Sequence, residues 1–136
     1  MNTVFKGGAS VDGQDLKTTL TLSPNQTLKI QGEIAVSANH VGSKADILIV
    51  AAFQPVDSEQ MLWFMVDNKQ AVVWDGLPTT LKGAQKDVTL TPSYLVDIYQ
   101  GALGDGNYLI YFGYRLENGM VVFNGERPID VQVRTP

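Results

Sequence analysis

Histidine, cysteine and paired acids are the side chains that could do chemistry in this chain, and they are few. His40 is the only histidine among 136 residues, and there is no cysteine. A Ser-His-Asp site would need His40 beside a nucleophilic serine, but no Gly-x-Ser-x-Gly turn occurs in the sequence. One histidine without thiolates also leaves zinc and copper without a ligand set. We therefore expect His40 to be a structural or exposed loop residue.

The 14 acidic residues include no pair that stands out as catalytic. Glycoside hydrolysis needs two carboxyl groups roughly 5 to 10 Å apart in a cleft. Asp97 and Glu117 lie close to an aromatic segment of the chain, but an acid on the solvent face of a strand is usually only solvated. The sequence therefore predicts that this chain is not an enzyme.

Calcium is the one metal whose oxygen ligands the sequence could supply. Asp12 and Asp15 lie in one glycine-bent turn, and Asp105 and Asn107 lie in another. Neither turn has the spacing of an EF-hand loop. Asp and Asn also bond to their own backbone in such turns without a metal. A calcium-stabilised structural domain stays open as an alternative, and no other cofactor is expected.

Aromatic residues supply the best candidate binding surface. Alternate side chains of a strand point to opposite faces, so Tyr111 and Arg115 should share one face of the run 108–116. Flat aromatic side chains stack on sugar rings and anchor protein interfaces. The expected ligand or partner face consists of Tyr111, Arg115, Tyr99, Trp63 and Phe123. The alternative is that another strand or domain covers this face and that the tryptophans lie in the core.

Charge and composition argue against two classes of partner. The net charge of −4 and the pI of about 4.7 leave no basic stripe for phosphates, so nucleic acid and anionic membrane surfaces are not expected partners. The longest apolar run, 47–53, is too short to insert across a bilayer. Because 136 residues is the usual size of one domain, we predict a single domain over residues 1–136.

Alternation of apolar and polar residues predicts strands along most of the chain. No window shows the apolar spacing of a helix, and turn signals recur roughly every 8 to 12 residues. This pattern predicts an all-β, antiparallel β-sandwich of about 8–10 strands with little or no helix, and a closed barrel is the alternative. The segments 16–22 and 129–133 are the expected edge strands. The predicted strands are 16–22, 28–36, 47–53, 61–66, 71–74, 87–90, 94–99, 108–116, 120–123 and 129–133.

The turn before the aromatic strand indicates the kind of sandwich. Tyr108 follows an acidic, glycine-containing turn at 104–107. This pattern resembles the tyrosine corner of immunoglobulin-like sandwiches, in which the tyrosine hydroxyl bonds to backbone a few residues upstream. Ile110 stands where true immunoglobulin domains have their second cysteine, so an apolar pair should replace the disulfide. We predict an immunoglobulin-like fold with Tyr108 as its structural corner.

Four runs of residues carry a further resemblance: 73–76, 96–101, 111–119 and 129–133. The aromatic-Phe-Gly-Tyr-Arg-Leu-x-x-Gly run is the most distinctive of them. Together they resemble a poorly characterised β-sandwich module that ends many large exported proteins of gammaproteobacteria. The resemblance implies a secreted or cell-surface setting, as part of a longer exported chain, and a noncatalytic role.

The first eight residues lack the basic head and apolar core of a signal peptide. A cytoplasmic protein therefore stays open beside a segment of an exported chain. Our leading hypothesis is a noncatalytic interaction module that serves adhesion, assembly or domain spacing, with a protein or glycan surface as its partner. The alternative is a carbohydrate-binding module with an aromatic stacking face. We expect a monomer in isolation, because charges on the edge strands discourage pairing.

Overall fold

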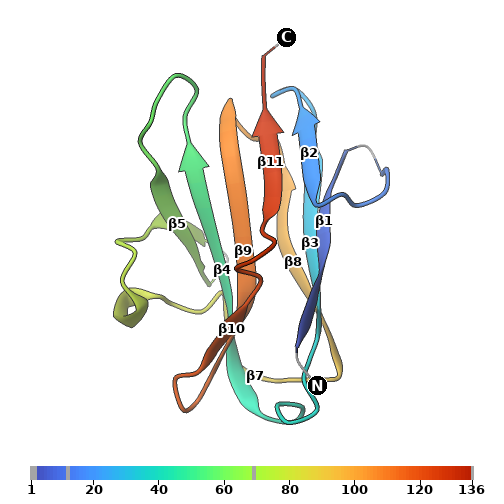
Figure 1. The fold of residues 1–136 in the computed structure, drawn as a ribbon, viewed down its shortest axis with the longest axis vertical. Coiled ribbons are helices and arrows are strands. Elements are labelled where there is room, and N and C mark those ends of the chain that lie inside the picture. The colour runs from blue at the N-terminus through green and yellow to red at the C-terminus, as the bar shows by residue number, and fades with distance from the viewer. Residues whose placement is uncertain (1–2, 12, 69, 136) are drawn as a thin grey trace.

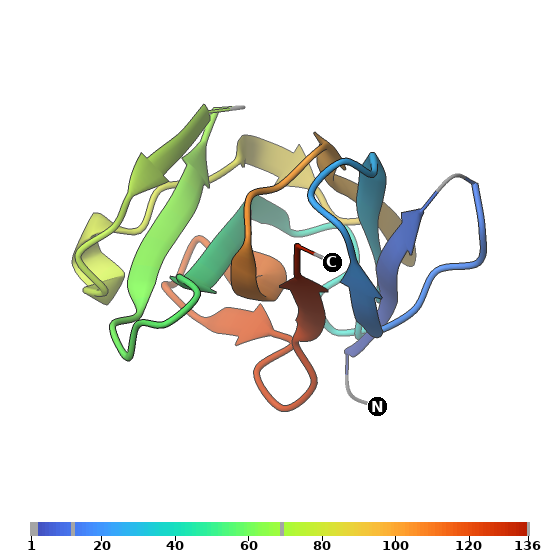
Figure 2. The same ribbon diagram turned by 90° about the horizontal axis from the view of Figure 1, so that it is seen from above.

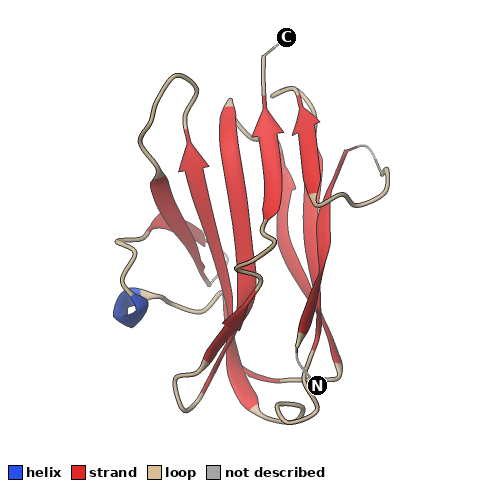
Figure 3. Cartoon of the chain, in the orientation of Figure 1, coloured by secondary structure: helices blue, strands red, loops and turns tan. Residues whose placement is uncertain are grey.

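The computed structural model describes residues 3–11, 13–68 and 70–135, and nearly all of its regular structure is β. Within these ranges it contains eleven strands and one 3-10 turn, η1 (Pro78–Thr80). The strands form two sheets that pack face to face (Figures 1 and 3). This arrangement confirms the predicted all-β sandwich and excludes the closed barrel.

The smaller sheet has three strands in the order β1-β3-β8. The main path of the larger sheet has the order β2-β11-β9-β4-β5-β6. In chain order the strands are β1 (Val4–Val11), β2 (Thr19–Leu22), β3 (Leu28–Ala35), β4 (Lys44–Gln54), β5 (Leu62–Asp67), β6 (Gln70–Val73), β7 (Gln85–Thr89), β8 (Ser93–Gly101), β9 (Gly106–Leu116), β10 (Val121–Phe123) and β11 (Ile129–Val133).

The antiparallel pair β4–β9 is the centre of the larger sheet, and each of its outer edges is shared by two shorter strands. The edge of β9 pairs with β11 near its start and with β10 near its end. The edge of β4 pairs with β7 near its start and with β5 near its end. Figure 2 shows the β5–β6 hairpin on the side of the molecule away from β1.

The core lies between the two sheets, and alternate residues of β3, β9 and β11 fill it. The side chains of Ile110, Phe112 and Tyr114 are all buried there, on the face of β9 opposite to Tyr111. Gly32 of β3 lies under the ring of Phe112, and a Cβ at this glycine would sit 2.5 Å from the ring. The bare backbone at Gly32 therefore lets the ring approach the smaller sheet closely.

The connections are those of an immunoglobulin-like sandwich. The strand order β11-β9-β4-β5-β6 matches the extended sheet of the variable type, which adds two strands beyond its central pair. At the start of β9 the hydroxyl of Tyr108 donates a 2.9 Å hydrogen bond to the carbonyl of Gly104. This bond has the geometry predicted for a tyrosine corner.

Two expectations about the strands need correction, namely that 129–133 is an edge and that a strand begins at Leu16. The last strand, β11, lies between β2 and β9 and is not an edge, because β2 adds to it as a parallel neighbour. The edges are β2 and β6 in the larger sheet and β1 and β8 in the smaller one. The predicted strand 16–22 begins later than expected, because β2 starts only at Thr19. Leu16 lies before it and is 44% exposed.

The sequence pattern missed β1 because Gly7 and Gly8 interrupt the alternation of its side chains. A Cβ at Gly8 would overlap the backbone of Lys17, which bridges to Ala9 with two 2.9 Å hydrogen bonds. These glycines are therefore sites of close backbone approach. No helix among the described residues is long and apolar enough to cross a membrane.

Candidate functional site

The outer face of the larger sheet is apolar, although the smaller sheet does not cover it. Leu48, Val50, Ala52 and Met65 have 8% or less of their surface exposed, yet they do not belong to the core between the sheets. They occupy alternate positions of β4 and β5, where Val50 pairs with Met65. The central strand β4 is thus apolar on both faces, as the sequence predicts, and its second face forms a separate apolar surface.

Four aromatic side chains follow one another across this outer face. The rings of Trp74 and Trp63 meet edge to face, with centroids 6.1 Å apart. Trp63 in turn stacks beside Tyr111 at 6.2 Å, and Tyr111 contacts Phe123 at 6.1 Å. The row therefore joins the end of β6, β5, β9 and β10, which are far apart in sequence.

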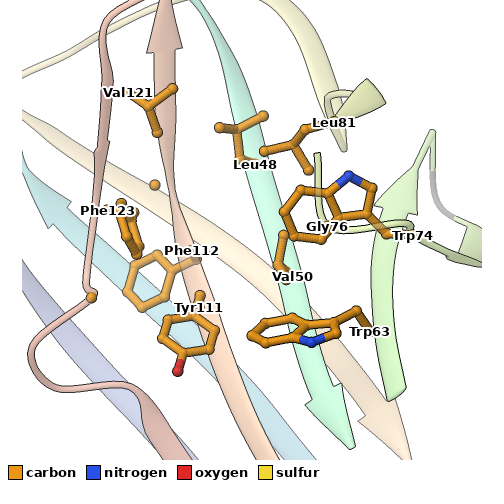
Figure 4. Close-up of a pocket in the computed structure, with 12 residues that line it drawn as sticks. Leu48, Val50, Trp63, Trp74, Gly76, Leu81, Tyr111, Phe112, Val121 and Phe123 are labelled. Carbon is orange, nitrogen blue, oxygen red and sulfur yellow. The ribbon is translucent and has the colours of Figure 1, made fainter. Parts of the chain in front are cut away.

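A cleft of about 720 Å³ opens above this row of rings (Figure 4). Leu48 and Val50 of β4 form its floor, opposite Gly113 and Tyr111 of β9. Because Gly113 has no side chain, the backbone of β10 lies close against the position across from Leu48.

Two walls rise from this floor, one on each side. Trp74, Trp63 and Leu81 form the wall beside β5 and β6. Val121 and Phe123 of β10 form the other wall, and 42% and 51% of their surfaces are exposed. The cleft is thus bounded by strands on both sides and is open to solvent above.

Short-range interactions fix the wall that β10 provides. A Cβ at Gly113 would overlap the carbonyl oxygen of Val122 and lie 2.6 Å from the Cα of Phe123, so β10 can approach β9 closely only at a glycine. Asn124 then fills the gap between β10 and β11. Its Oδ1 accepts a 2.8 Å hydrogen bond from the backbone N–H of Phe112, and its buried side chain thereby replaces a strand neighbour.

A tied loop fixes the opposite wall. The indole Nε1 of Trp74 donates to the carbonyl of Leu77 at 3.0 Å and to Oγ1 of Thr80 at 3.1 Å. Asp75 Oδ1 accepts from the Leu77 N–H at 2.9 Å and from the Thr80 hydroxyl at 2.5 Å. Both hydrogen bonds lower the pKa of the Asp75 carboxyl, and the bond from Thr80 has the larger effect.

Arg115 supports the cleft instead of facing a ligand, which corrects its predicted place in the binding face. Its Nη2 lies 3.1 Å from Oδ2 of Asp46, and both side chains are largely shielded from solvent. Its Nη1 donates a 2.7 Å hydrogen bond to the carbonyl of Leu81. The guanidinium therefore connects β9 and β4 to the loop that carries Leu81 into the wall.

Tyr99 is the second correction to the predicted face. It lies on β8 in the smaller sheet, and its hydroxyl donates to the carbonyl of Ala102 at 2.7 Å. Trp63, Tyr111 and Phe123 do come together as predicted. Trp63 is 37% exposed, so it belongs to this open face and not to the core between the sheets.

The candidate calcium ligands are engaged elsewhere or exposed. Asp105 Oδ2 accepts a short hydrogen bond from the hydroxyl of Thr135, and Asn107 Oδ1 accepts one of 2.6 Å from Arg134. Asp15 is exposed, and Asp12 lies outside the described residues. In the described part of the chain no three His, Asp or Glu side chains cluster closely enough to hold a metal ion.

His40 belongs to a structural network at the end of the core. Its Nδ1 lies 2.7 Å from the hydroxyl of the buried Tyr114, which in turn lies 2.8 Å from Oγ1 of Thr3. Oγ1 of Thr3 also accepts a hydrogen bond from the backbone N–H of Ser37. This arrangement orients the phenol of Tyr114 and makes His40 a structural residue, one of the two roles expected for it.

Comparisons with known proteins bear on the fold alone. No protein family model matches the sequence, and no curated protein matches it. Among solved structures, that of murine CRIg, an immunoglobulin-domain protein, is similar with a TM-score of 0.43 and 11% sequence identity. The match covers 100% of this chain and 99% of that chain.

Sequence reasoning missed Trp74, Leu81 and Val121 as parts of the site. Trp74 is the last residue of the predicted strand 71–74, but its partner Trp63 is known only once the register of the β5–β6 hairpin is fixed. Leu81 lies in a loop without any periodic pattern. Val121 faces the cleft only because β10 shares the edge of β9 with β11.

Proposed function

We propose that this chain is a noncatalytic interaction module of an exported bacterial protein and that it contacts a partner protein through the outer face of its larger sheet. The observation that carries the proposal is the apolar cleft with its exposed aromatic rim. Isolated apolar residues on a surface are ordinary, but a contiguous patch bordered by polar residues marks an interaction site. Aromatic side chains such as Trp63 and Phe123 are the anchors that such interfaces use most often.

The placement of the chain ends fits a role in assembly or domain spacing. Figure 1 places the two ends at opposite poles of the long axis. Neighbouring domains attached at both ends would therefore leave the outer face of the larger sheet free. The exported setting follows from the resemblance of the run 111–119 to modules of exported proteins.

The test is site-specific photo-crosslinking in the source organism. A photoreactive phenylalanine analogue at Phe123 should crosslink to one defined protein on the cell surface. The same analogue at Leu95, which is 72% exposed on the opposite sheet, is the matched control and should give no such product. Equal products from both positions, or crosslinking confined to cytoplasmic proteins, would contradict the proposal.

A carbohydrate-binding module is the second candidate. The hydroxyl of Tyr111 and the indole N–H of Trp63 have no hydrogen-bond partner among the described residues, and both lie at the same rim of the cleft. These polar groups beside aromatic rings are the elements from which sugar sites are built. The rings of Trp63 and Tyr111 lie beside each other, with their centroids 6.2 Å apart. Tryptophan fluorescence across a panel of bacterial and plant polysaccharides decides between the two, because a saturable response to one glycan would favour this candidate.

The module should be a monomer in isolation. Its net charge of −4 adds mutual repulsion between copies. Light scattering at about 100 μM checks this expectation, since weak association becomes visible at such concentrations. A dimer that persists in 0.5 M salt would instead identify the apolar face as a contact between copies, and Tyr111→Ser should then dissociate it.

A further inference from the structure

The interior of the cleft is lined almost entirely by carbon atoms. In Figure 4 the hydroxyl of Tyr111 and the indole nitrogen of Trp63 lie at the edge of the site, on the side away from Val121 and Leu48. The indole nitrogen of Trp74 is already bonded to its own loop. Among the described residues no charged side chain lines the cavity. Whatever binds inside it finds apolar contacts and no group that would pair with a charge.

The size of the cavity is that of a small-molecule site. Pockets for small ligands commonly measure roughly 300 to 1,000 Å³ and are lined mainly by apolar and aromatic side chains. The volume of about 720 Å³ falls inside this range. It is far larger than the voids of a well-packed interior, which seldom exceed one water molecule.

The walls of the cavity are held in place before any ligand binds. The floor belongs to the central strands β4 and β9, and Arg115 and Asp75 fix the loop behind Trp74 and Leu81. A site that is already formed spends little of its binding energy on ordering its own side chains.

We propose that this cleft binds a neutral, apolar small molecule, either aromatic or branched aliphatic, through its hydrocarbon surface. A charged ligand would lose its hydration without gaining a partner in the cavity. A sugar would leave several hydroxyl groups unpaired there for the same reason. The inference goes beyond the proposed interaction with a partner protein, because the ligand enters the cavity whereas the partner contacts its rim.

The probe is N-phenyl-1-naphthylamine, a neutral dye whose fluorescence rises in apolar surroundings. Trp63 and Trp74 are the only tryptophans of the chain, and both line the cleft. Energy transfer from tryptophan to the dye therefore reports that the dye is bound to the chain, and the variants below locate the site. We expect saturable binding of one dye per chain, accompanied by quenching of the tryptophan emission.

Variants separate binding in the cleft from adsorption elsewhere. Val121→Phe adds a ring at the rim of the cavity and should weaken dye binding at least tenfold. Leu95→Phe adds the same ring at an exposed position of β8 and should leave the dissociation constant unchanged. Phe123→Ala removes one wall and provides a second test if Val121→Phe does not fold. Circular dichroism and the melting temperature establish that each variant is folded.

Two results would overturn the proposal. The first is uptake of dye that does not saturate, or that is the same in Val121→Phe and Phe123→Ala as in the unmodified chain. The second is weakening of dye binding by Leu95→Phe to the same extent as by Val121→Phe, which would place the bound dye outside the cleft. Failure of the dye to bind, with specific crosslinking from position 123 retained, would remove the small-molecule site and leave the proposed function standing.

Discussion

The two faces of the β4–β9 pair show how the same strands build a closed core on one side and an open cleft on the other. On the inner face Ile47 lies across from Tyr114, and the smaller sheet closes over both. On the outer face Leu48 lies across from Gly113, and no second sheet covers them. Both faces are apolar, so composition does not distinguish them. On the outer face Gly113 lets β10 approach β9 and form one wall, and the smaller sheet lies on the other side of the pair.

Truncation of matched residues on the two faces gives the largest effect. Ile47→Ala should lower the free energy of unfolding by about 3 to 4 kcal/mol, because it leaves a cavity that cannot collapse. Leu48→Ala should cost only about 1 to 2 kcal/mol, since its side chain borders a space that solvent can enter. Urea unfolding of both variants measures the difference. Equal losses would mean that the outer face is as closed as the inner one.

Gly113→Ala tests whether the glycine is what lets β10 approach β9 and form one wall of the cleft. The new Cβ would collide with the backbone of β10 at Val122, which cannot give way as a flexible side chain can. We expect a loss of about 2 to 3 kcal/mol, typical of overpacking. Gly119→Ala would not serve as a control because its φ of 92° is itself unfavourable for alanine. Gly104→Ala is suitable, since nothing lies within 4 Å of its Cβ position.

Tyr108→Phe tests the tyrosine corner at the start of β9, the strand that contributes side chains to both the core and the cleft. Loss of the hydrogen bond to Gly104 should lower the free energy of unfolding by about 1 kcal/mol in urea. A loss below about 0.3 kcal/mol, smaller than that of a typical net hydrogen bond, would contradict the assigned role.

The same residue also predicts a dependence on alkaline pH. Burial raises the pKa of the Tyr108 hydroxyl above 10.0, and the nearby Tyr99 and Asp105 raise it further. The folded state therefore holds this proton more tightly than the unfolded state does. The resulting stability is complete below pH 10 and is lost as the pH rises through the folded pKa. Tyr108→Phe should lose less stability than the unmodified chain over this interval, as measured by urea unfolding at several pH values.

Arg115→Met tests how firmly one wall of the cleft is held, without changing an apolar side chain of either face. It removes the ion pair with Asp46 and the hydrogen bond to Leu81, so that one wall of the cleft is less firmly held. The free energy of unfolding should fall by no more than about 1 kcal/mol, because the pair is partly exposed to solvent. Tryptophan emission should nevertheless shift to the red as water reaches Trp74. An unchanged emission spectrum would show that the wall does not depend on Arg115.

Acidification should give the smallest effect, confined to the loop behind Trp74. The pKa of Asp75 is lower in the folded chain than its ordinary value of 3.8, because Thr80 and Leu77 donate to the carboxylate. Its stabilising contribution is therefore present above pH 3.8 and is lost as the pH falls through the folded value. A change in tryptophan fluorescence should accompany this loss. Asp75→Asn should lack the change, and persistence of the same acid transition in that variant would assign it to another group.

Several features of the fold were predictable from the sequence because they depend on neighbours along the chain. Alternation in residues 28–36 and 129–133 sets which side chains enter the core, and the structure confirms both. The Asn118–Gly119 turn and the corner at Tyr108 follow in the same way, since turn geometry depends on a few adjacent residues. Residue type and strand alternation predicted that Trp63, Tyr111 and Phe123 share one face, and the structure brings their rings together.

The remainder depended on contacts between segments far apart in the chain. The strand β1 exists because Gly7 and Gly8 allow close backbone approach, which no local pattern indicates. Tyr99 and Arg115 were expected in the binding face because of their residue types. The sheet pairing instead places Tyr99 in the smaller sheet, and Arg115 bonds to the carbonyl of Leu81 and holds one wall of the cleft. The sequence by itself determined that the chain forms an all-β sandwich with two apolar faces on β4, because side-chain alternation is a local property. Only the tertiary structure decided which face is covered and which strands surround the open one, because register and sheet order are set by long-range packing.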